Sequence, residues 1–151
     1  MKIIFAASSG GHFEQIMMLK PLMEKHDSVI VTEKTKYGVG KADFKTYYLR
    51  QINRKEILFL PKLILNTITS FKIVLKEKPD VMITTGVLSI IPLALIMKMM
   101  RRKLIYIESF AKVTSKTLSG KFLYKYADQF YVQWEQMLDL YPNAIYKGGI
   151  Y

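Results

Sequence analysis

The sequence predicts an α/β fold built on a doubly wound parallel sheet, in a single domain over residues 1–151. Short apolar runs alternate with segments of helical periodicity, which is typical of parallel strands joined by crossover helices. The first run, Lys2–Ala7, is apolar on both faces, as expected for a central strand that helices cover on both sides. A length of 151 residues suits one domain with a sizeable core.

The elements follow in alternating order along the chain. The apolar runs predict strands at Lys2–Ala7, Ser28–Thr32, Thr46–Arg50, Val81–Thr84, Leu104–Ile107, Gln129–Val132 and Ala144–Tyr146. The segments between them predict helices at about His12–Lys25, Lys55–Glu77, Leu88–Met100, Ser119–Tyr126 and Trp134–Leu140. Pro21 removes a backbone donor, so we expect a kink in the first helix.

The long helix expected at Lys55–Glu77 has an unusual distribution of apolar residues. Its helical spacing predicts a buried stripe of Ile64, Ile68, Phe71 and Leu75. The same spacing predicts that Asn66, Thr67 and Ser70 face solvent. Its first half is apolar on all sides, so Leu58, Phe59 and Leu63 need another apolar surface to cover them.

Basic residues flank this apolar patch, namely Arg50, Arg54, Lys55 and Lys62. Apolar side chains beside basic ones favour an anionic membrane interface, where each Lys or Arg contributes about 1 kcal/mol. Burial under a neighbouring loop or against a protein partner is the alternative. No stretch reaches the ~20 apolar residues that span a bilayer, and no signal peptide is evident, so we expect peripheral attachment.

The charge and the cysteine content limit the possible functions. The net charge of +11 suggests a polyanionic partner: nucleic acid, an anionic membrane or a diphosphate-bearing substrate. The absence of cysteine excludes disulfides, thiolate metal sites and thiol nucleophiles. Two separated histidines predict no metal site, and the sequence contains no P-loop and no G-x-S-x-G motif.

Three polar segments follow the first, fourth and fifth expected strands. They are Ser8–His12, Thr84–Gly86 and Glu108–Phe110. Ligands of open α/β sheets bind at the carboxyl ends of the strands, near the point where the strand order reverses, so these segments are expected to share one site. The two glycines of "SSGGH" let the backbone approach an anion such as a diphosphate, or they form only a tight turn.

Two side chains at this edge could transfer protons. His12 titrates near neutrality, and a helix N-terminus would lower its pKa and favour the neutral, base-competent form. Glu108 ends an apolar strand, where a carboxylate either acts on substrate or caps the following turn through Ser109. The residues leave both readings open for each side chain.

"SSGGH", "KPDVMITTG" and "KLIYIES" resemble segments of the membrane-binding, acceptor-side subunit of split glycosyltransferases. This group includes PssD-type proteins of capsule and exopolysaccharide synthesis and the anchoring subunit of the dolichol-diphosphate N-acetylglucosamine transferase. "FYVQWEQM" and "YPNAIYKGG" match the closing segment of that family. The pattern also resembles the N-terminal half of the peptidoglycan N-acetylglucosaminyltransferase. The resemblance implies a Rossmann-like fold corresponding to one half of a GT-B enzyme.

The resemblance also implies the role of each half. A separate donor subunit would bind the UDP-sugar, and this chain would bind a polyprenyl-diphosphate-linked saccharide at the cytoplasmic face of the cell membrane. His12 or Glu108 would be the base of an inverting transfer that needs no cofactor or metal. The residues implied in acceptor binding are Ser9, Gly10, Gly11, Thr85, Gly86 and Ser109. Those implied in docking the donor subunit are Trp134, Tyr146, Gly148, Gly149 and Tyr151.

Two other functions compete with this one. A stand-alone nucleotide-binding protein would use Glu33, after the second strand, to bind a ribose, although "SSGGHFEQ" lacks the third glycine of G-x-G-x-x-G. A nucleic-acid-binding module would explain the basic charge, but it would leave the apolar patch at Leu58, Phe59 and Leu63 unexplained. We therefore expect no nucleic-acid partner.

Overall fold

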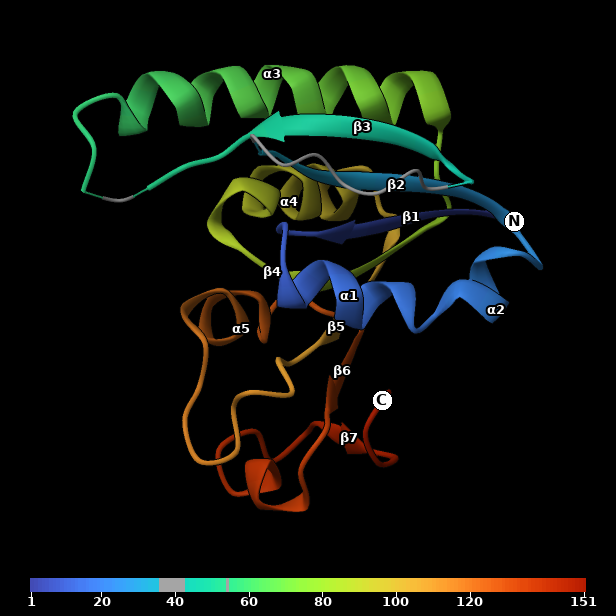
Figure 1. The fold of residues 1–151 in the computed structure, drawn as a ribbon, viewed down its shortest axis with the longest axis vertical. Helices are drawn as coiled ribbons and strands as arrows, with labels where there is room; N and C mark the ends of the chain where they lie inside the picture. The colour runs from blue at the N-terminus through green and yellow to red at the C-terminus, as the bar shows by residue number, and fades with distance from the viewer. Residues whose placement is uncertain (36–42, 54) are drawn as a thin grey trace.

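A computed structural model describes residues 1–35, 43–53 and 55–151 (Figure 1). Arg54, expected at the membrane, lies outside the described residues. The strands are β1 (Lys2–Ala7), β2 (Asp27–Lys34), β3 (Lys45–Arg50), β4 (Val81–Gly86), β5 (Lys103–Ile107), β6 (Gln129–Val132) and β7 (Ile145–Tyr146). The helices are α1 (Gly11–Met17), α2 (Lys20–Met23), α3 (Phe59–Glu77), η1 (Leu88–Ile90), α4 (Ile91–Met99), α5 (Leu118–Leu123) and η2 (Glu135–Leu138).

All seven strands pair in parallel, in the order β3-β2-β1-β4-β5-β6-β7. The order reverses between β1 and β4, which confirms the doubly wound, Rossmann-like sheet. The crevice where such sheets bind ligands therefore lies beyond the carboxyl ends of these two strands. The polar segments that follow β1, β4 and β5 meet at this edge.

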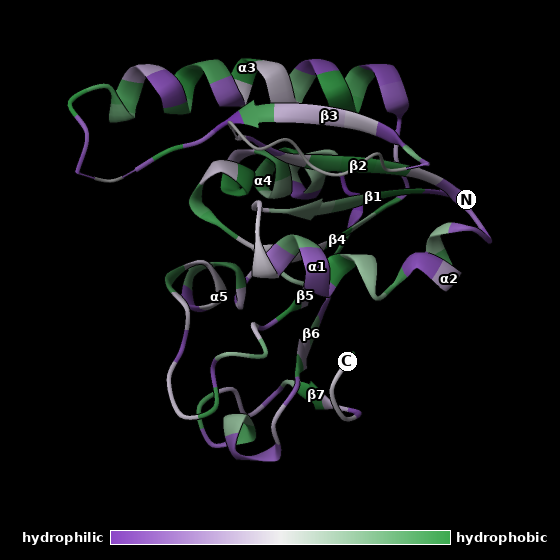
Figure 2. Ribbon diagram, in the orientation of Figure 1, coloured by the Kyte–Doolittle hydropathy of each residue, from purple (hydrophilic) through white to green (hydrophobic). Residues whose placement is uncertain are grey.

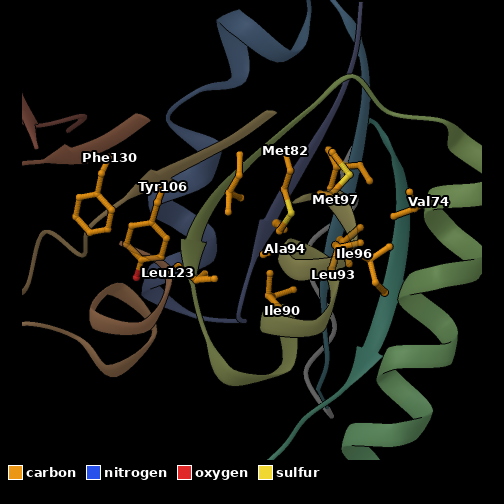
Figure 3. Close-up of a cluster of buried hydrophobic side chains, with 14 of the residues drawn as sticks. Val74, Met82, Ile90, Leu93, Ala94, Ile96, Met97, Tyr106, Leu123 and Phe130 are labelled. Carbon is orange, nitrogen blue, oxygen red and sulfur yellow. The ribbon is translucent and has the colours of Figure 1, made fainter. Parts of the chain in front are cut away.

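The core lies on both faces of the sheet. On one face, β-strand side chains such as Met82 pack against α4, while α3 lies beside α4 and packs against the edge strand β3 (Figure 3). Tyr106 and Phe130 extend this cluster by stacking at 4.7 Å between ring centroids. On the other face, Phe5 and Ile83 pack against Ile16 of α1 and Met23 of α2. The sheet is thus covered by helices on both sides, as the apolar first strand predicts.

The first helical segment differs from the sequence expectation. A single kinked helix was expected over His12–Lys25, but the chain forms two short helices with a break at Met18 and Leu19. Pro21 occupies the first turn of α2, where a backbone N–H would have no acceptor within the helix, so the proline costs no hydrogen bond there. The proline therefore starts a second helix instead of kinking the first.

The rotation of α3 is opposite to the sequence expectation. Asn66 and Ser70, expected in solvent, are 1% and 0% exposed. Leu60, Ile64, Ile68, Phe71 and Leu75, here called the α3 stripe, are between 48% and 64% exposed. The helix lies at the outer edge of the fold, and hydrophobic residues recur along its whole length (Figure 2). The expectation of a buried stripe at Ile64, Ile68, Phe71 and Leu75 was therefore wrong.

The reason for this rotation lies in the edge strand β3. The Asn66 side chain accepts a hydrogen bond from the Arg50 amide at 2.9 Å and donates one to the Arg50 carbonyl at 2.8 Å. A strand end covered by a helix needs partners for its backbone groups, because an unpaired buried polar group costs about 1–3 kcal/mol. The polar face of α3 supplies them, so the apolar face turns outward.

Glu77 fixes the other end of α3 against the sheet. Its buried carboxylate accepts hydrogen bonds from Lys2 of β1, at 3.0 Å, and from Lys45 and Tyr47 of β3. Burial opposes the charge of Glu77, but these three donors outweigh it and lower the carboxyl pKa from 4.5 to about 2.

We expect Glu77→Gln to destabilise the fold at pH 7 by about 2 kcal/mol, because charge-assisted hydrogen bonds are lost. Since the folded pKa is depressed, this contribution is complete above pH 4.5 and is lost as the pH falls towards 2. Urea unfolding of wild type and variant should therefore converge between these pH values. Glu24→Gln, an exposed control, should show no such difference. A stability gap that stays constant to pH 2 would contradict the assignment.

Candidate functional site

The glycine loop after β1 lies at the point where the strand order reverses. Gly10 has φ 78° and ψ −144°, a conformation that is essentially restricted to glycine. Gly11 is exposed, and no atom lies within 4 Å of the place where a Cβ would stand on it. Thr85 donates from Oγ1 to the His12 carbonyl at 3.2 Å and so joins the loop to β4. The loop thus leaves open space beside its second glycine.

A large open cavity of about 1190 Å³ lies beside this loop. Its walls come from the segment between β3 and α3, the segment around η1, and the segment from β5 into α5. The charged lining residues are Lys55, Glu56, Lys62, Lys112 and Lys116, and the apolar ones include Leu63, Leu88, Ile91, Leu118 and Phe122. Glu56 pairs with Lys62 at 2.6 Å. The cavity is therefore both positively charged and apolar.

A smaller cavity of about 360 Å³ also borders the glycine loop. It is lined by Gly11, His12, Gln15, Ser109, Phe110, Ala111 and Tyr151. His12 lines both cavities, so this residue stands at their boundary. The structure thus brings Gly11, His12 and Ser109 together at one site.

His12 is half-buried, and its Nδ1 is buried without a hydrogen-bond partner in the described part of the chain. Burial lowers the His12 pKa below 6.5, and the nearby negative charge of Glu108 opposes this shift only in part. The imidazole is therefore neutral at pH 7 and can accept a proton. This agrees with the direction expected from the sequence, although burial is the cause and α1 has only seven residues.

Glu108 is in a different situation. It is 1% exposed, and its carboxylate accepts hydrogen bonds from the Ser109 amide at 2.8 Å, the Thr117 hydroxyl at 2.8 Å and the Tyr141 hydroxyl at 2.8 Å. The Thr117 amide adds a fourth, at 3.3 Å. The carboxylate is thus occupied by protein donors, and Tyr141 and Thr117 are the partners that sequence reasoning missed.

Thr85 and Gly86 lie beneath the surface of the site. Thr85 is 0% exposed, and Gly86 is buried with φ 83°. A Cβ on Gly86 would stand 2.4 Å from the Tyr106 hydroxyl and 2.5 Å from the Ser119 hydroxyl. Gly86 therefore permits the close packing of β4 against β5 and α5, and its position explains the glycine without a ligand. Ser9, beside the glycine loop, is half-buried.

The residues expected at a membrane divide into two groups. Leu58 is 58% exposed, whereas Phe59 is half-buried at the start of α3. Lys55, Lys62 and Leu63 line the large cavity. The larger apolar surface is the α3 stripe, and the sequence expectation placed four of its five residues, all but Leu60, in the core. None of the helices in residues 1–35, 43–53 and 55–151 has the length and hydropathy of a membrane span.

Three of the five residues expected to dock a partner pack on Phe110, namely Trp134, Gly149 and Tyr151. Trp134 donates from Nε1 to the Phe110 carbonyl at 2.7 Å, and Tyr151 meets the Phe110 ring edge-on at 5.0 Å. A Cβ on Gly149 would stand 3.3 Å from the same ring. Tyr146 and Tyr151 remain 40% and 60% exposed, and Gly148 turns with φ 87°. The tail therefore borders the small cavity next to His12.

The family model described as "Oligosaccharide biosynthesis protein Alg14 like" matches residues 42–150. The UDP-N-acetylglucosamine transferase subunit ALG14 of Yarrowia lipolytica is 31% identical over 97% of this chain and 80% of its own length. The protein of the same name from Homo sapiens is 26% identical, over 99% of this chain and 83% of its own length.

Solved structures agree on the fold. MurG of Acinetobacter baumannii superposes with a TM-score of 0.75 at 13% identity, over 90% of this chain. The UDP-GlcNAc 2-epimerase of Neisseria meningitidis, bound to UDP-GlcNAc, gives 0.73 at 12% identity over 99% of this chain. This chain spans only 43% and 47% of those two chains, which is less than half of each. The fold is thus shared with glycosyltransferases and epimerases alike, whereas the sequence match is specific: the chain belongs to the Alg14-like family of oligosaccharide biosynthesis proteins.

Proposed function

We propose that this chain is the acceptor-binding, membrane-associating subunit of a heteromeric inverting glycosyltransferase. A separate donor subunit binds a UDP-sugar, UDP-N-acetylglucosamine by analogy with the relatives' names. The acceptor is a polyprenyl-diphosphate-linked saccharide. The observation that carries the proposal is an alignment over 97% of this chain with a protein named as a transferase subunit. The fold supports the proposal, because this chain corresponds to 43% of the MurG chain, as expected for one half of a divided enzyme.

His12 is the base in this proposal. Its neutral imidazole accepts the proton of the acceptor hydroxyl while the hydroxyl oxygen attacks the anomeric carbon of the donor sugar. The bond from that carbon to the UDP oxygen breaks on the opposite side, and UDP leaves from the donor subunit with the bonding electrons. Glu108 is the weaker candidate, because four protein donors already occupy its carboxylate.

Peripheral attachment at the cytoplasmic face of the cell membrane completes the proposal. The α3 stripe supplies exposed apolar area, and Lys72 and Lys76 lie exposed beside it. Between Glu56 and Glu77 the sequence contains no acidic residue. An outward apolar face with basic neighbours fits the surface of an anionic bilayer. A role in capsule or exopolysaccharide synthesis stays a prediction, because the named relatives bear only on the sugar transfer.

A stand-alone nucleotide-binding protein is less well supported. Glu33 would have to bind a ribose, but its side chain is only 3% exposed at the end of β2. Burial raises the pKa of this carboxyl, which weakens it as a charged hydrogen-bond acceptor. We therefore propose no second function.

The function is tested by sugar transfer from UDP-N-acetylglucosamine to a polyprenyl-diphosphate-linked saccharide. The assay compares this chain alone, the donor-subunit candidate (the protein encoded beside it) alone, and the two together. We expect turnover only in the mixture. Full turnover by this chain alone would contradict the division into two subunits, and a mixture inactive towards a panel of saccharides would contradict the proposed activity.

Replacing His12 by Ala should reduce turnover in the mixture by about 100-fold or more, which is typical for a lost general base. In wild type, turnover should fall as the pH drops through the His12 pKa, which burial keeps below 6.5. The variant should lose this acidic limb of the pH profile. His26→Ala, in the segment between α2 and β2, is the matched control and should behave as wild type. Normal turnover of His12→Ala would refute the assignment of the base.

Replacing Ile68 and Phe71 by Ser should weaken binding to vesicles that contain anionic lipid by about 10-fold or more, since two apolar side chains no longer enter the interface. Co-sedimentation measures this effect. Met99→Ser removes an apolar side chain that is even more exposed, 82% at the far end of α4, and should not change binding. Equal binding of all three proteins would exclude the α3 stripe as the membrane surface.

A further inference from the structure

The loop between β5 and α5, residues 109–117, is closed at its base by a single carboxylate. Glu108 accepts hydrogen bonds from the amide of Ser109 at the start of the loop and from the amide and hydroxyl of Thr117 at its end. The hydroxyl of Tyr141, which follows η2 in the chain, donates a hydrogen bond to the same carboxylate at 2.8 Å. Thr117 in turn accepts from the Gly120 amide and caps α5. Because Glu108 holds both ends, the loop has a defined position beside the cavity.

This loop presents two lysines to the large cavity. Lys112 is half-buried, and its amide bonds to the Ser109 carbonyl at 3.0 Å in a turn. The Lys116 ammonium lies 4.7 Å from the centre of the Tyr141 ring, so the residue that bonds to Glu108 also orients Lys116. Among the described residues no carboxylate lies within 4 Å of either ammonium group. Two uncompensated positive charges therefore stand at one wall.

Apolar side chains continue this wall away from the lysines. Leu118 and Phe122 of α5 line the same cavity and are 59% and 37% exposed. Leu63 of α3 also lines this cavity. A cavity with two cations and an adjacent apolar surface matches a ligand whose anionic group is joined directly to a hydrocarbon chain.

We propose that Lys112 and Lys116 bind the diphosphate of a prenyl-diphosphate carrier and that Leu118 and Phe122 contact its first isoprenoid units. This assignment rests on the proposed function and moves the diphosphate away from the glycine loop. That loop carries no cation, whereas the large cavity carries several. The saccharide then extends from the lysines towards His12, at the boundary of the two cavities. Glu108 is a positioning residue that acts through the loop.

The test is a calorimetric titration of the full chain with farnesyl diphosphate, which is a soluble short-chain prenyl diphosphate. Lys112→Gln/Lys116→Gln should bind it at least ~10-fold more weakly than wild type, since charge-assisted contacts are lost. Lys25→Gln/Lys103→Gln changes the net charge equally. These two lysines are exposed near the amino-terminal ends of β2 and β5, away from the cavity, and this double variant should bind as wild type. Equal weakening of the two double variants would reduce the effect to general electrostatics and overturn the proposal.

Further ligands and variants separate the parts of the site. Leu118→Ser/Phe122→Ser should weaken binding of farnesyl diphosphate but leave binding of inorganic pyrophosphate unchanged. Gly11→Ala places a methyl group in open space without strain, so it tests the glycine loop as the alternative diphosphate site. We expect it to bind farnesyl diphosphate as wild type does. Binding that is lost in Gly11→Ala and retained in the lysine double variant would overturn the proposal, as would a wild-type chain that does not bind.

Glu108→Gln tests the positioning role. It should weaken binding of farnesyl diphosphate and increase hydrogen exchange in residues 109–117, and its effect should not add to that of the lysine double variant. Thr117→Val removes one of the same bonds while keeping Glu108, and should act in the same direction. Unchanged binding in both variants would exclude this role. These measurements need neither donor nor partner, so a failed sugar transfer and a failed diphosphate site are distinguishable.

Discussion

The pairing of Asn66 with the backbone of Arg50 sets the rotation of α3, and much of the functional surface depends on that rotation. The amide satisfies both main-chain groups of the last residue of β3, so the polar side of the helix must face the sheet. Glu77, on the same side of the helix, binds donors from β1 and β3. Because two polar anchors point inward, Ile68 and Phe71 point outward. An amphipathic helix is thereby turned into an external apolar surface.

The same arrangement links the outer surface to the cavity. The first turns of α3 bring Lys62 and Leu63 to one wall of the large cavity, while α5 brings Leu118 and Phe122 to another. Exposed apolar residues thus occur both along α3 and at the cavity. A substrate that remains anchored in a bilayer needs such a continuous arrangement, because its hydrocarbon part must stay out of water while its head group reaches the base. The positive charge of the chain, +11 overall, is consistent with this use.

Much of the fold could be predicted from the sequence, because it rests on local patterns. The apolar runs identified every strand to within two residues, and the strand order brought the glycine loop and Glu108 to one edge as expected. The rotation of α3 could not be predicted, since hydropathy assigns the apolar side of a helix to the core. It does not register the backbone N–H and C=O groups of an edge strand that need hydrogen-bond partners. The signal for the rotation was present in Asn66 and Ser70, whose spacing places them on one face with Glu77.

The site could be predicted only in part for a similar reason. The positions of His12 and Glu108 followed from the strand ends, but the difference between them depends on distant residues. Glu108 is occupied by Thr117 and Tyr141, which lie nine and 33 residues further along the chain. In the sequence, Lys112 and Lys116 are only two lysines in a loop after β5, which is weak evidence for a binding site. The structure shows that both line the same cavity.

The central claim is that donor and acceptor are bound by different chains. The most direct test is the binding of UDP-N-acetylglucosamine, measured by calorimetry for this chain, for its donor-subunit candidate and for their mixture. The account predicts that the candidate subunit and the mixture bind the nucleotide sugar and that this chain alone does not. Saturable binding of UDP-N-acetylglucosamine by this chain alone, with an affinity equal to that of the mixture, would contradict the account.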